Sequence, residues 1–269
     1  MDSTWRLIEH GCGDPYWNMA VDEAIFKSFC AGKSPPTIRF YLWNRPSISL
    51  GRFQKPDGSI DTGYCKTNGI SIVRRPTGGR AVLHGTDQTF SVVKEHGGAS
   101  VEESYAGLSR AVTEALTEVG VPVKPFSTAS DRLEMVSAAN CFDLKARFEV
   151  ALHGRKIFGC AQLRAEQSVL QQNSLILEAP DADNVNAFVG GCPSMSGVCV
   201  AHYADRDTIT RSICKAIVRN LRVSLHLMDL TDEESELAST LVRCKYSADA
   251  WNKNGRRDFV DSELSGVIY

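Results

Sequence analysis

The order of apolar and polar residues at the start of the chain predicts one helix among several strands. Residues 5–11 indicate a short opening strand. A helix should follow, because Asp14 suits the N-cap, Pro15 the first helical position and Gly32 the C-terminal stop. Four more strands are predicted from runs rich in β-branched and aromatic residues, at 37–44, 47–54, 70–76 and 88–94.

Capping patterns mark two of the later helices. A Ser-x-x-Glu pattern at 100–103 precedes residues 101–119, whose apolar side chains recur at helical spacing. Residues 207–221 predict another helix, and a Thr-x-x-Glu pattern at 231–234 opens a further one at 231–246.

A loop, a hairpin and a strand are predicted between these helices. Residues 125–140 are polar and irregular, which indicates a long loop. The segment 147–162 predicts a hairpin that turns at His153-Gly154, because glycine tolerates the positive φ that such turns need. Residues 168–178 predict another strand.

The order of these elements predicts the fold class. Strands in the middle, with helices before, between and after them, indicate an α+β fold with a mixed, largely antiparallel sheet flanked by helices. Strict βαβ alternation, which a doubly wound fold requires, is missing from the sequence. We expect one domain over 1–230, a C-terminal helix and docking segment over 231–252, and a flexible tail over 253–269.

Composition and charge remove several classes of function. Hydrophobic residues make up 43% of the 269 residues and charged residues 23%, which suits a globular protein with a substantial core. The net charge of -2 argues against bulk binding to nucleic acid. No run approaches the roughly 18 apolar residues of a membrane span, and the start of the chain does not resemble a secretory signal. We expect a cytoplasmic protein.

The nine cysteines are odd in number and scattered. No two of them have the C-x-x-C spacing that is common in zinc sites and dithiols, so no metal site is expected. In a reducing compartment most cysteines are small buried hydrophobes, and Cys214 lies in an apolar helical stripe of this kind. The neighbouring residues must therefore indicate which thiol, if any, is reactive.

The segment 72–93, IVRRPTGGRAVLHGTDQTFSVV, differs most from ordinary core sequence. Its Gly-Gly pair lets backbone approach a ligand closely, and its three arginines can bind anionic or carbonyl groups. The glycine spacing matches neither a phosphate loop nor a dinucleotide-binding motif. A hairpin turn with surface arginines is the alternative, and His84 is either a polar strand end, a base or a residue that orients a ligand.

Cys141 is the candidate nucleophile. It lies where the polar loop meets the predicted hairpin, whereas Cys214 lies in a core stripe. A nucleophilic thiol needs partial exposure and a nearby cation that lowers its pKa. Lys156 follows the hairpin turn, and antiparallel pairing would bring it back towards the start of the first hairpin strand. An inert thiol is the alternative.

Several of these segments resemble one known superfamily. RRPTGGRAVLHG, at 74–85, is similar to the first signature of the lipoate ligases, octanoyltransferases and biotin ligases, and GRKIFGCAQLR is similar to the second. Stretches within residues 4–54 and the segment 245–252 also match, in the expected order. NCFD, at 140–143, resembles the cysteine-dependent octanoyltransferases of this superfamily. The resemblance implies the α+β catalytic domain that biotin and lipoate ligases share with class II synthetases.

The resemblance also implies roles for individual residues. Cys141 would carry the acyl group as a thioester, and Lys156 would lower the pKa of its thiol. The residues expected to contact the substrate are Arg75, Gly78, Gly79, Arg80, His84, Gly159 and Ala161. The chain departs from common family patterns at Gly85 and at 171–174, which concern pocket details and the preferred acceptor.

The implied reaction moves an octanoyl group from octanoyl-acyl carrier protein to Cys141, and then to a lysine of a lipoyl domain. The acceptor would be glycine cleavage protein H or a 2-oxoacid dehydrogenase subunit. No cofactor, nucleotide or metal is expected, and the enzyme is expected to be a monomer that binds no nucleic acid and no membrane. Three alternatives remain: an ATP-dependent lipoate–protein ligase, an amidotransferase acting between lipoyl domains, and a non-catalytic binding module.

Overall fold

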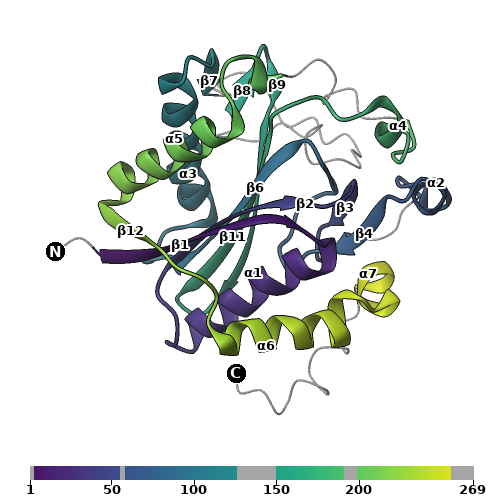
Figure 1. The fold of residues 1–269 in the computed structure, drawn as a ribbon, viewed down its shortest axis with the longest axis horizontal. Helices are drawn as coiled ribbons and strands as arrows, with labels where there is room; N and C mark the ends of the chain where they lie inside the picture. The colour runs from purple at the N-terminus through teal and green to yellow at the C-terminus, as the bar shows by residue number, and fades with distance from the viewer. Residues whose placement is uncertain (1–2, 55–57, 126–149, 191–198, 256–269) are drawn as a thin grey trace.

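A six-stranded mixed sheet runs through the middle of the structure (Figure 1). The computed structural model describes residues 3–54, 58–125, 150–190 and 199–255. Three of the five strand pairs in this sheet are antiparallel, and both pairs made by β1 are parallel. From edge to edge the strands are β10 (Phe158–Ala165), β11 (Ser168–Ile176), β6 (Asp87–Glu95), β2 (Thr37–Trp43), β1 (Ser3–Gly13) and β12 (Val223–Leu227).

Helices cover both faces of this sheet (Figure 1). On one face α3 (Val101–Glu118) packs against α5 (Arg206–Leu221), and together with the sheet they enclose what we call the first core. On the other face α1 (Pro15–Cys30) packs against α6 (Asp232–Leu241) around the second core. The mixed sheet between two helical layers confirms the predicted α+β class.

Strand β2 shows how one strand serves both cores. Successive side chains of a strand point to opposite faces of the sheet. Ile38 and Phe40 accordingly lie in the first core, while Tyr41 and Trp43 lie in the second, and all four are buried. The face that carries Tyr41 and Trp43 is the one that borders the candidate site described below.

Two small sheets complete the strand structure. One contains β4 (Ser71–Arg74), β3 (Ser47–Leu50) and β5 (Val82–His84), and the other contains β7 (Val123–Pro125), β8 (Val150–Leu152) and β9 (Arg155–Lys156). The turn between β8 and β9 has φ values of 51° at His153 and 76° at Gly154. The hairpin turn predicted at these two residues is therefore confirmed.

Short helical segments lie between and after these elements, and none of the described helices is long and apolar enough to cross a membrane. The C-terminal segment returns to the second core, where Trp251 is 1% exposed and Lys245 donates to Glu23 at 2.7 Å. The short elements are α2 (Thr62–Thr67), α4 (Ala182–Val185), a 3₁₀ turn (Val200–His202), a π-helical turn (Val242–Tyr246) and α7 (Asp249–Asn254).

Most of the predicted elements agree with the structure, but one strand of the main sheet was not predicted. Asp14 caps α1, and both capping boxes are present at α3 and α6. The helices predicted at 207–221 and 231–246 correspond to α5 and to α6 with the π-helical turn, and the unpredicted strand, β12 (Val223–Leu227), lies between them. Arg222, with a φ of 54°, ends α5, and the residues after it pair in parallel with β1. The loop predicted over 125–140 lies almost wholly outside the described residues.

Candidate active site

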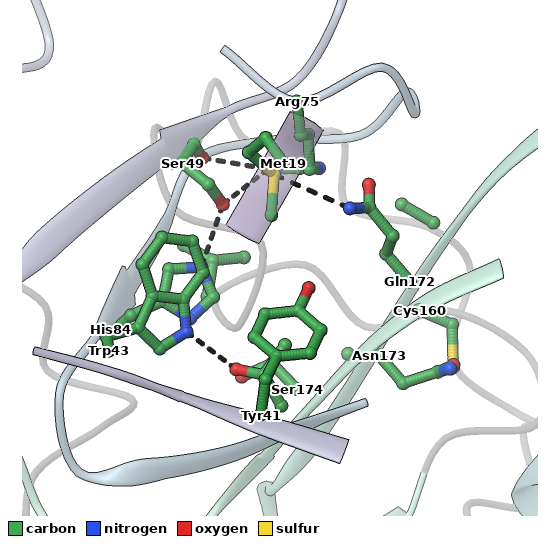
Figure 2. A pocket seen from close by; sticks show the side chains of 14 residues that line it. Met19, Tyr41, Trp43, Ser49, Arg75, His84, Cys160, Gln172, Asn173 and Ser174 are labelled. Atoms are coloured by element: carbon green, nitrogen blue, oxygen red, sulfur yellow. Dashed lines mark hydrogen bonds between the residues drawn. The ribbon is translucent and has the colours of Figure 1, made fainter. Parts of the chain in front are cut away.

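A pocket opens between the main sheet and the small sheet that contains β3 and β5 (Figure 2). Its empty volume, including part of the open mouth, is about 360 Å³. The lining residues are Met19, Tyr41, Trp43, Ser49, Arg75, Val82, His84, Thr89, Gly159, Cys160, Ala161, Gln172, Asn173 and Ser174.

The first arginine of the RRPTGG segment stabilises the fold beside this pocket. Arg74 is 1% exposed. Its guanidinium donates to the carbonyl oxygens of Gly51 at 2.7 Å and Gln54 at 2.8 Å, and to that of Trp251 at 2.9 Å. Cations are favourable near the carbonyl groups at the end of a helix. Arg74 therefore joins the loop after β3 to α7.

The second arginine shapes the glycine turn. Nη2 of Arg75 donates to the carbonyl oxygens of Gly78 at 2.6 Å and Arg80 at 2.7 Å. Its Nη1 donates to the carbonyl oxygen of Ser49 at 2.8 Å. Charge-assisted hydrogen bonds of this kind are stronger than neutral ones. Arg75 therefore fixes the turn against β3 while it also lines the pocket.

Glycine is required at two places in this contact. Gly79 has a φ of 87°, which L-residues with a side chain rarely adopt. A Cβ atom on Gly51 would lie 1.9 Å from the carbonyl oxygen of Gly79, which is far inside van der Waals contact. The turn and the loop after β3 can approach this closely only because neither residue has a side chain.

His84 is fixed on three sides. Its Nδ1 lies 2.8 Å from Oδ2 of Asp87, and its Nε2 lies 2.8 Å from Oγ of Ser49. The Trp43 ring stacks on it, with 4.0 Å between centroids and 15° between planes. The carboxylate can only accept, so Nδ1 carries a proton, and in the neutral ring Nε2 accepts from Ser49. His84 is thus a rigid wall of the pocket.

Asp87 is ionised at neutral pH. Burial would raise the pKa of its carboxyl group, but the charge and hydrogen bond of His84, with hydrogen bonds from Ser174 and the Gly85 N–H, lower it to about 2. Ser174 donates to Asp87 Oδ2 at 2.7 Å. The carboxylate thereby fixes residues from β5 and β11 at one end of the pocket.

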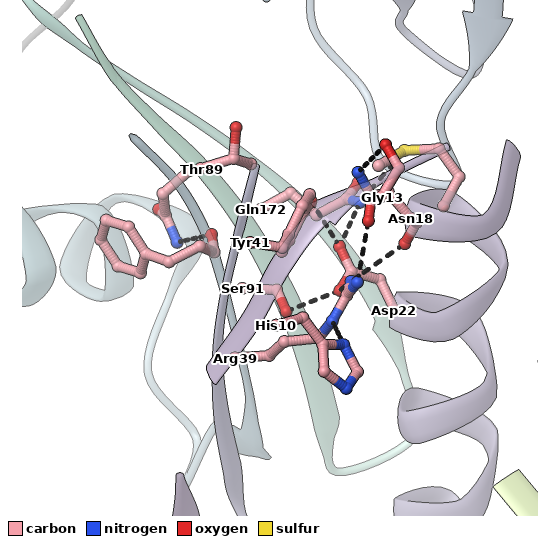
Figure 3. Close-up of polar contacts among 12 residues, drawn as sticks. His10, Gly13, Asn18, Asp22, Arg39, Tyr41, Thr89, Ser91 and Gln172 are labelled. Atoms are coloured by element: carbon pink, nitrogen blue, oxygen red, sulfur yellow. Dashed lines mark hydrogen bonds and ion pairs between the residues drawn. The ribbon is translucent and has the colours of Figure 1, made fainter. Parts of the chain in front are cut away.

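A second buried carboxylate lies beside the pocket, between α1 and the sheet (Figure 3). Asp22 accepts from Nη1 of Arg39 at 2.7 Å and from the Ser91 hydroxyl at 2.8 Å, both at Oδ1. At Oδ2 it accepts from the Tyr41 hydroxyl at 2.8 Å and from Nε2 of Gln172 at 2.7 Å. Four donors therefore satisfy this buried charge, as a carboxylate inside a protein requires.

Arg39 extends this network towards His10. Its Nε donates to Nδ1 of His10 at 2.9 Å. Burial and the neighbouring Arg39 charge lower the pKa of His10 to about 4, so the ring is neutral at neutral pH. Among the described residues, no group of three or more His, Cys, Asp or Glu side chains is placed to hold a metal ion.

The residues expected to contact substrate fall into two groups. Four line the pocket, namely Arg75, His84, Gly159 and Ala161. The other three, Gly78, Gly79 and Arg80, form the turn that Arg75 holds next to it. The N–H of Gly78 lies 3.4 Å from the carbonyl oxygen of Gln162 on β10, so the turn adjoins the strand that carries the second signature.

The structure describes only one residue of the expected catalytic pair, Lys156. Cys141 lies outside the described residues. Lys156 is on β9, is 8% exposed, and its backbone lies opposite Ala151. It precedes Gly159 of the pocket wall by three residues, although it is not itself among the described residues that line the pocket.

The described thiols differ in environment. Burial, followed by the charge of Asp61, raises the pKa of Cys65 to about 11. Burial, followed by the charge of Glu9, raises that of Cys214 to about 12. Both are therefore protonated and weakly nucleophilic at neutral pH, as expected for core cysteines. Cys160 is different, because it lines the pocket.

Sequence reasoning missed several residues of the site. Met19 and Trp43 belong to elements that were interpreted only as helix and strand, and no signal distinguished them from core. Asp22 and Arg39 did carry a signal, because each is a charged residue inside an otherwise apolar run. Charged residues are rarely buried unless they are paired, so two such positions predict a buried ion pair.

Comparison with known proteins places the chain in a family. The family model of the lipoyl protein ligase A/B catalytic domain matches residues 14–225, so the chain belongs to this family. Among its curated relatives are proteins named octanoyltransferase LipM. The one from Kyrpidia tusciae is 35% identical over 271 residues, which cover 93% of this chain and 98% of the relative. The one from Moorella thermoacetica is 45% identical over 180 residues, 65% of each chain.

Solved structures share the fold. A putative lipoate protein ligase from T. acidophilum with bound lipoic acid superposes with a TM-score of 0.77 at 26% identity, covering 94% of this chain and 99% of that one. A lipoate-protein ligase A bound with ATP gives a TM-score of 0.79 at 25% identity, covering 95% and 100%. The expected lipoate ligase fold is therefore confirmed.

Proposed function

We propose that this protein is an octanoyltransferase that moves an octanoyl group from octanoyl-acyl carrier protein to Cys141, and from Cys141 to a lysine of a lipoyl domain. The enzyme class, an acyltransferase of protein lipoylation, follows from its family and from relatives that align over nearly their full length. The donor, the thioester and the acceptor are our inference. The pocket is the structural observation that carries it.

The lining of the pocket suits an alkyl chain although half of it is polar. Ser49, His84 and Ser174 donate or accept hydrogen bonds within the protein. Thr89 donates to Asp87, and Gln172 donates to Asp22. A polar group that is already hydrogen-bonded does not need water, so an apolar ligand covers it at little cost. Together with Met19, Trp43 and Val82, these residues form a surface that supports binding of a medium-length acyl chain.

The first half-reaction loads the enzyme. The Cys141 thiolate attacks the carbonyl carbon of the donor thioester, the new C–S bond forms, and the bond to the carrier's sulfur breaks. Lys156 would stabilise the thiolate, since a nearby cation lowers the pKa of a thiol. The N–H of Gly78 makes only a long hydrogen bond to Gln162, at 3.4 Å, so we propose that it turns to the developing oxyanion.

The second half-reaction transfers the octanoyl group to the acceptor. A lysine amine attacks the Cys141 thioester, the amide C–N bond forms, and the C–S bond breaks. The proton lost by the amine returns to the Cys141 thiolate. A thioester remains reactive enough towards an amine for this step, and no nucleotide has to be consumed. Glycine cleavage protein H and 2-oxoacid dehydrogenase subunits are the acceptors we propose.

Intact-mass spectrometry tests the thioester. After incubation with octanoyl-acyl carrier protein, we expect one octanoyl adduct on the wild type and none on Cys141→Ala. The exposed thiol of Cys30 supplies a matched control, because Cys30→Ser should still form the adduct. Lys156→Ala should slow alkylation of Cys141 at neutral pH, because less of the thiol would then be ionised.

Three outcomes would contradict this mechanism. A wild type that modifies the acceptor without ever carrying an adduct would rule out the thioester. An adduct that persists in Cys141→Ala and disappears in Cys160→Ala would move the nucleophile to Cys160, which lines the pocket. Acceptor modification that needs ATP and free lipoate, and survives loss of Cys141, would instead identify a ligase like those with which the chain shares its fold.

A further inference from the structure

Gln172 lines the pocket (Figure 2) and contacts both the buried Asp22 (Figure 3) and Thr77 beside the glycine turn. Its side-chain Nε2 donates to Oδ2 of Asp22 at 2.7 Å. Its Oε1 accepts from the Thr77 hydroxyl at 2.8 Å. Gln172 is 6% exposed and Thr77 is fully buried, so both hydrogen bonds are shielded from water.

The orientation of this amide is determined by its partners. A carboxylate only accepts hydrogen bonds, so the amide nitrogen of Gln172 must face Asp22 and the amide oxygen must face Thr77. Asp22 is itself immobile, because Arg39, Tyr41 and Ser91 donate to it from two strands of the sheet. The hydrogen bonds therefore run in one direction, from Thr77 to Gln172 and from Gln172 to Asp22.

Thr77 is the last residue before the Gly78-Gly79 pair. Its carbonyl oxygen accepts from the backbone N–H of Arg52 at 2.8 Å, and its hydroxyl is held by Gln172. Arg75 holds the following carbonyl, that of Gly78, at 2.6 Å. The turn is thus held by backbone contacts to Arg52 and, at 3.4 Å, to Gln162, and by the side chains of Arg75 and Gln172, of which Gln172 belongs to the main sheet.

We propose that Gln172 is a positioning residue for acyl transfer. Its side chain links Asp22, which is fixed in the sheet, to Thr77, and so determines where the Gly78-Gly79 turn lies beside the acyl pocket. The two hydrogen bonds of Gln172, to Asp22 and from Thr77, are called the relay below. This inference rests on the proposed octanoyl transfer. Gln172 also lines the pocket, as do its neighbours Asn173 and Ser174. Removal of the relay should leave the fold intact and move the turn.

The Thr77 hydroxyl gives the first test, because Thr77→Val keeps the β-branched shape and removes the donor to Gln172. We expect kcat/KM for loading from octanoyl-acyl carrier protein to fall about tenfold, the usual effect of losing about 1.4 kcal/mol of transition-state stabilisation. Thr77→Ser restores the hydroxyl and should restore the rate. Thr113→Val is the matched control, because it makes the same substitution in α3, outside the pocket lining, and removes a hydroxyl bond of the same length, 2.8 Å to the carbonyl oxygen of Ser109.

The second test uses charge. In Gln172→Glu the new carboxyl group has to donate a proton to the Asp22 carboxylate in order to keep the relay, so it works only when it is protonated. The rate of the variant relative to the wild type should therefore fall as the pH rises. A residue needed only for stability would not create this new limb in the pH–rate profile.

Hydrogen exchange of the 75–82 segment separates this proposal from the proposed function. Exchange there should accelerate in Thr77→Val and remain at the wild-type rate in Thr113→Val. If the wild type never forms an acyl adduct but exchange still follows this pattern, the proposed function fails and the relay stands as a structural fact. If Thr77→Val loads within twofold of the wild type, or if Thr113→Val loses as much as Thr77→Val, the positioning role is wrong.

Discussion

Charged side chains near the pocket act mainly on other protein groups. Arg74 and Arg75 donate to backbone carbonyl oxygens, and Asp22 accepts from four side chains. This differs from an anion-binding loop, in which the cations would face the ligand. Asp87 is the clearest case, because its carboxylate binds the pocket histidine, and its effect on stability can be measured.

We predict that Asp87 contributes stability that disappears in acid. Its pKa is about 2 in the folded protein against an ordinary value of 3.8. A depressed pKa gives stability that is complete above pH 4 and is lost as the pH falls towards 2. The shift corresponds to about 2 kcal/mol. In Asp87→Asn, which cannot titrate, the stability deficit relative to the wild type should shrink by this amount between pH 4 and pH 2, as measured by urea unfolding.

Asp207→Asn serves as the control for this experiment, because it removes the same charge at an exposed position in the first turn of α5. Its difference from the wild type over the same pH range measures the effect of removing an exposed carboxylate and is subtracted from that of Asp87→Asn. Parallel pH curves for the wild type and Asp87→Asn would show that the His84–Asp87 contact adds nothing to stability.

At the level of the elements, the sequence predicted the features that depend on residues close together in the chain, such as helix caps. The caps of α1, α3 and α6 depend on residues within four positions of one another, so they were visible in the sequence. Strand β12 was not, because it pairs only with β1, more than two hundred residues earlier. The apolar residues that follow α5 do not indicate that this segment pairs with a strand at the start of the chain.

The two capping boxes give a matched prediction. Glu103 of α3 is exposed, whereas Glu234 of α6 is 1% exposed and binds Arg6 through both oxygens, at 2.6 and 2.7 Å. Glu234→Ala therefore leaves the buried Arg6 unpaired and should cost about 3–5 kcal/mol of unfolding free energy. Glu103→Ala should have a much smaller effect. Similar losses for both variants in urea unfolding would mean that the Arg6 pair adds nothing to the cap.

At the level of the whole molecule, the site is assembled from distant segments. The 74–84 segment could be singled out from its composition, and it supplies Arg75 and His84 to the pocket. Its partners could not, because Thr77 and Gln172 are 95 positions apart and meet only after the sheet has formed. Periodicity predicts which face of an element is buried, but it does not predict which buried polar residues will pair across that face.

The shared sheet predicts that both cores unfold together. Leu116 in the first core and Ile25 in the second are fully buried on opposite faces of the sheet. Substitution of either by alanine should cost about 2–5 kcal/mol, because it removes packed apolar atoms and leaves a cavity. Since β2 contributes side chains to both cores, loss of one core should disrupt the other. Urea unfolding of each variant, followed by far-UV circular dichroism and tryptophan fluorescence, should therefore give coincident single transitions, and two separated transitions would mean that the cores are independent.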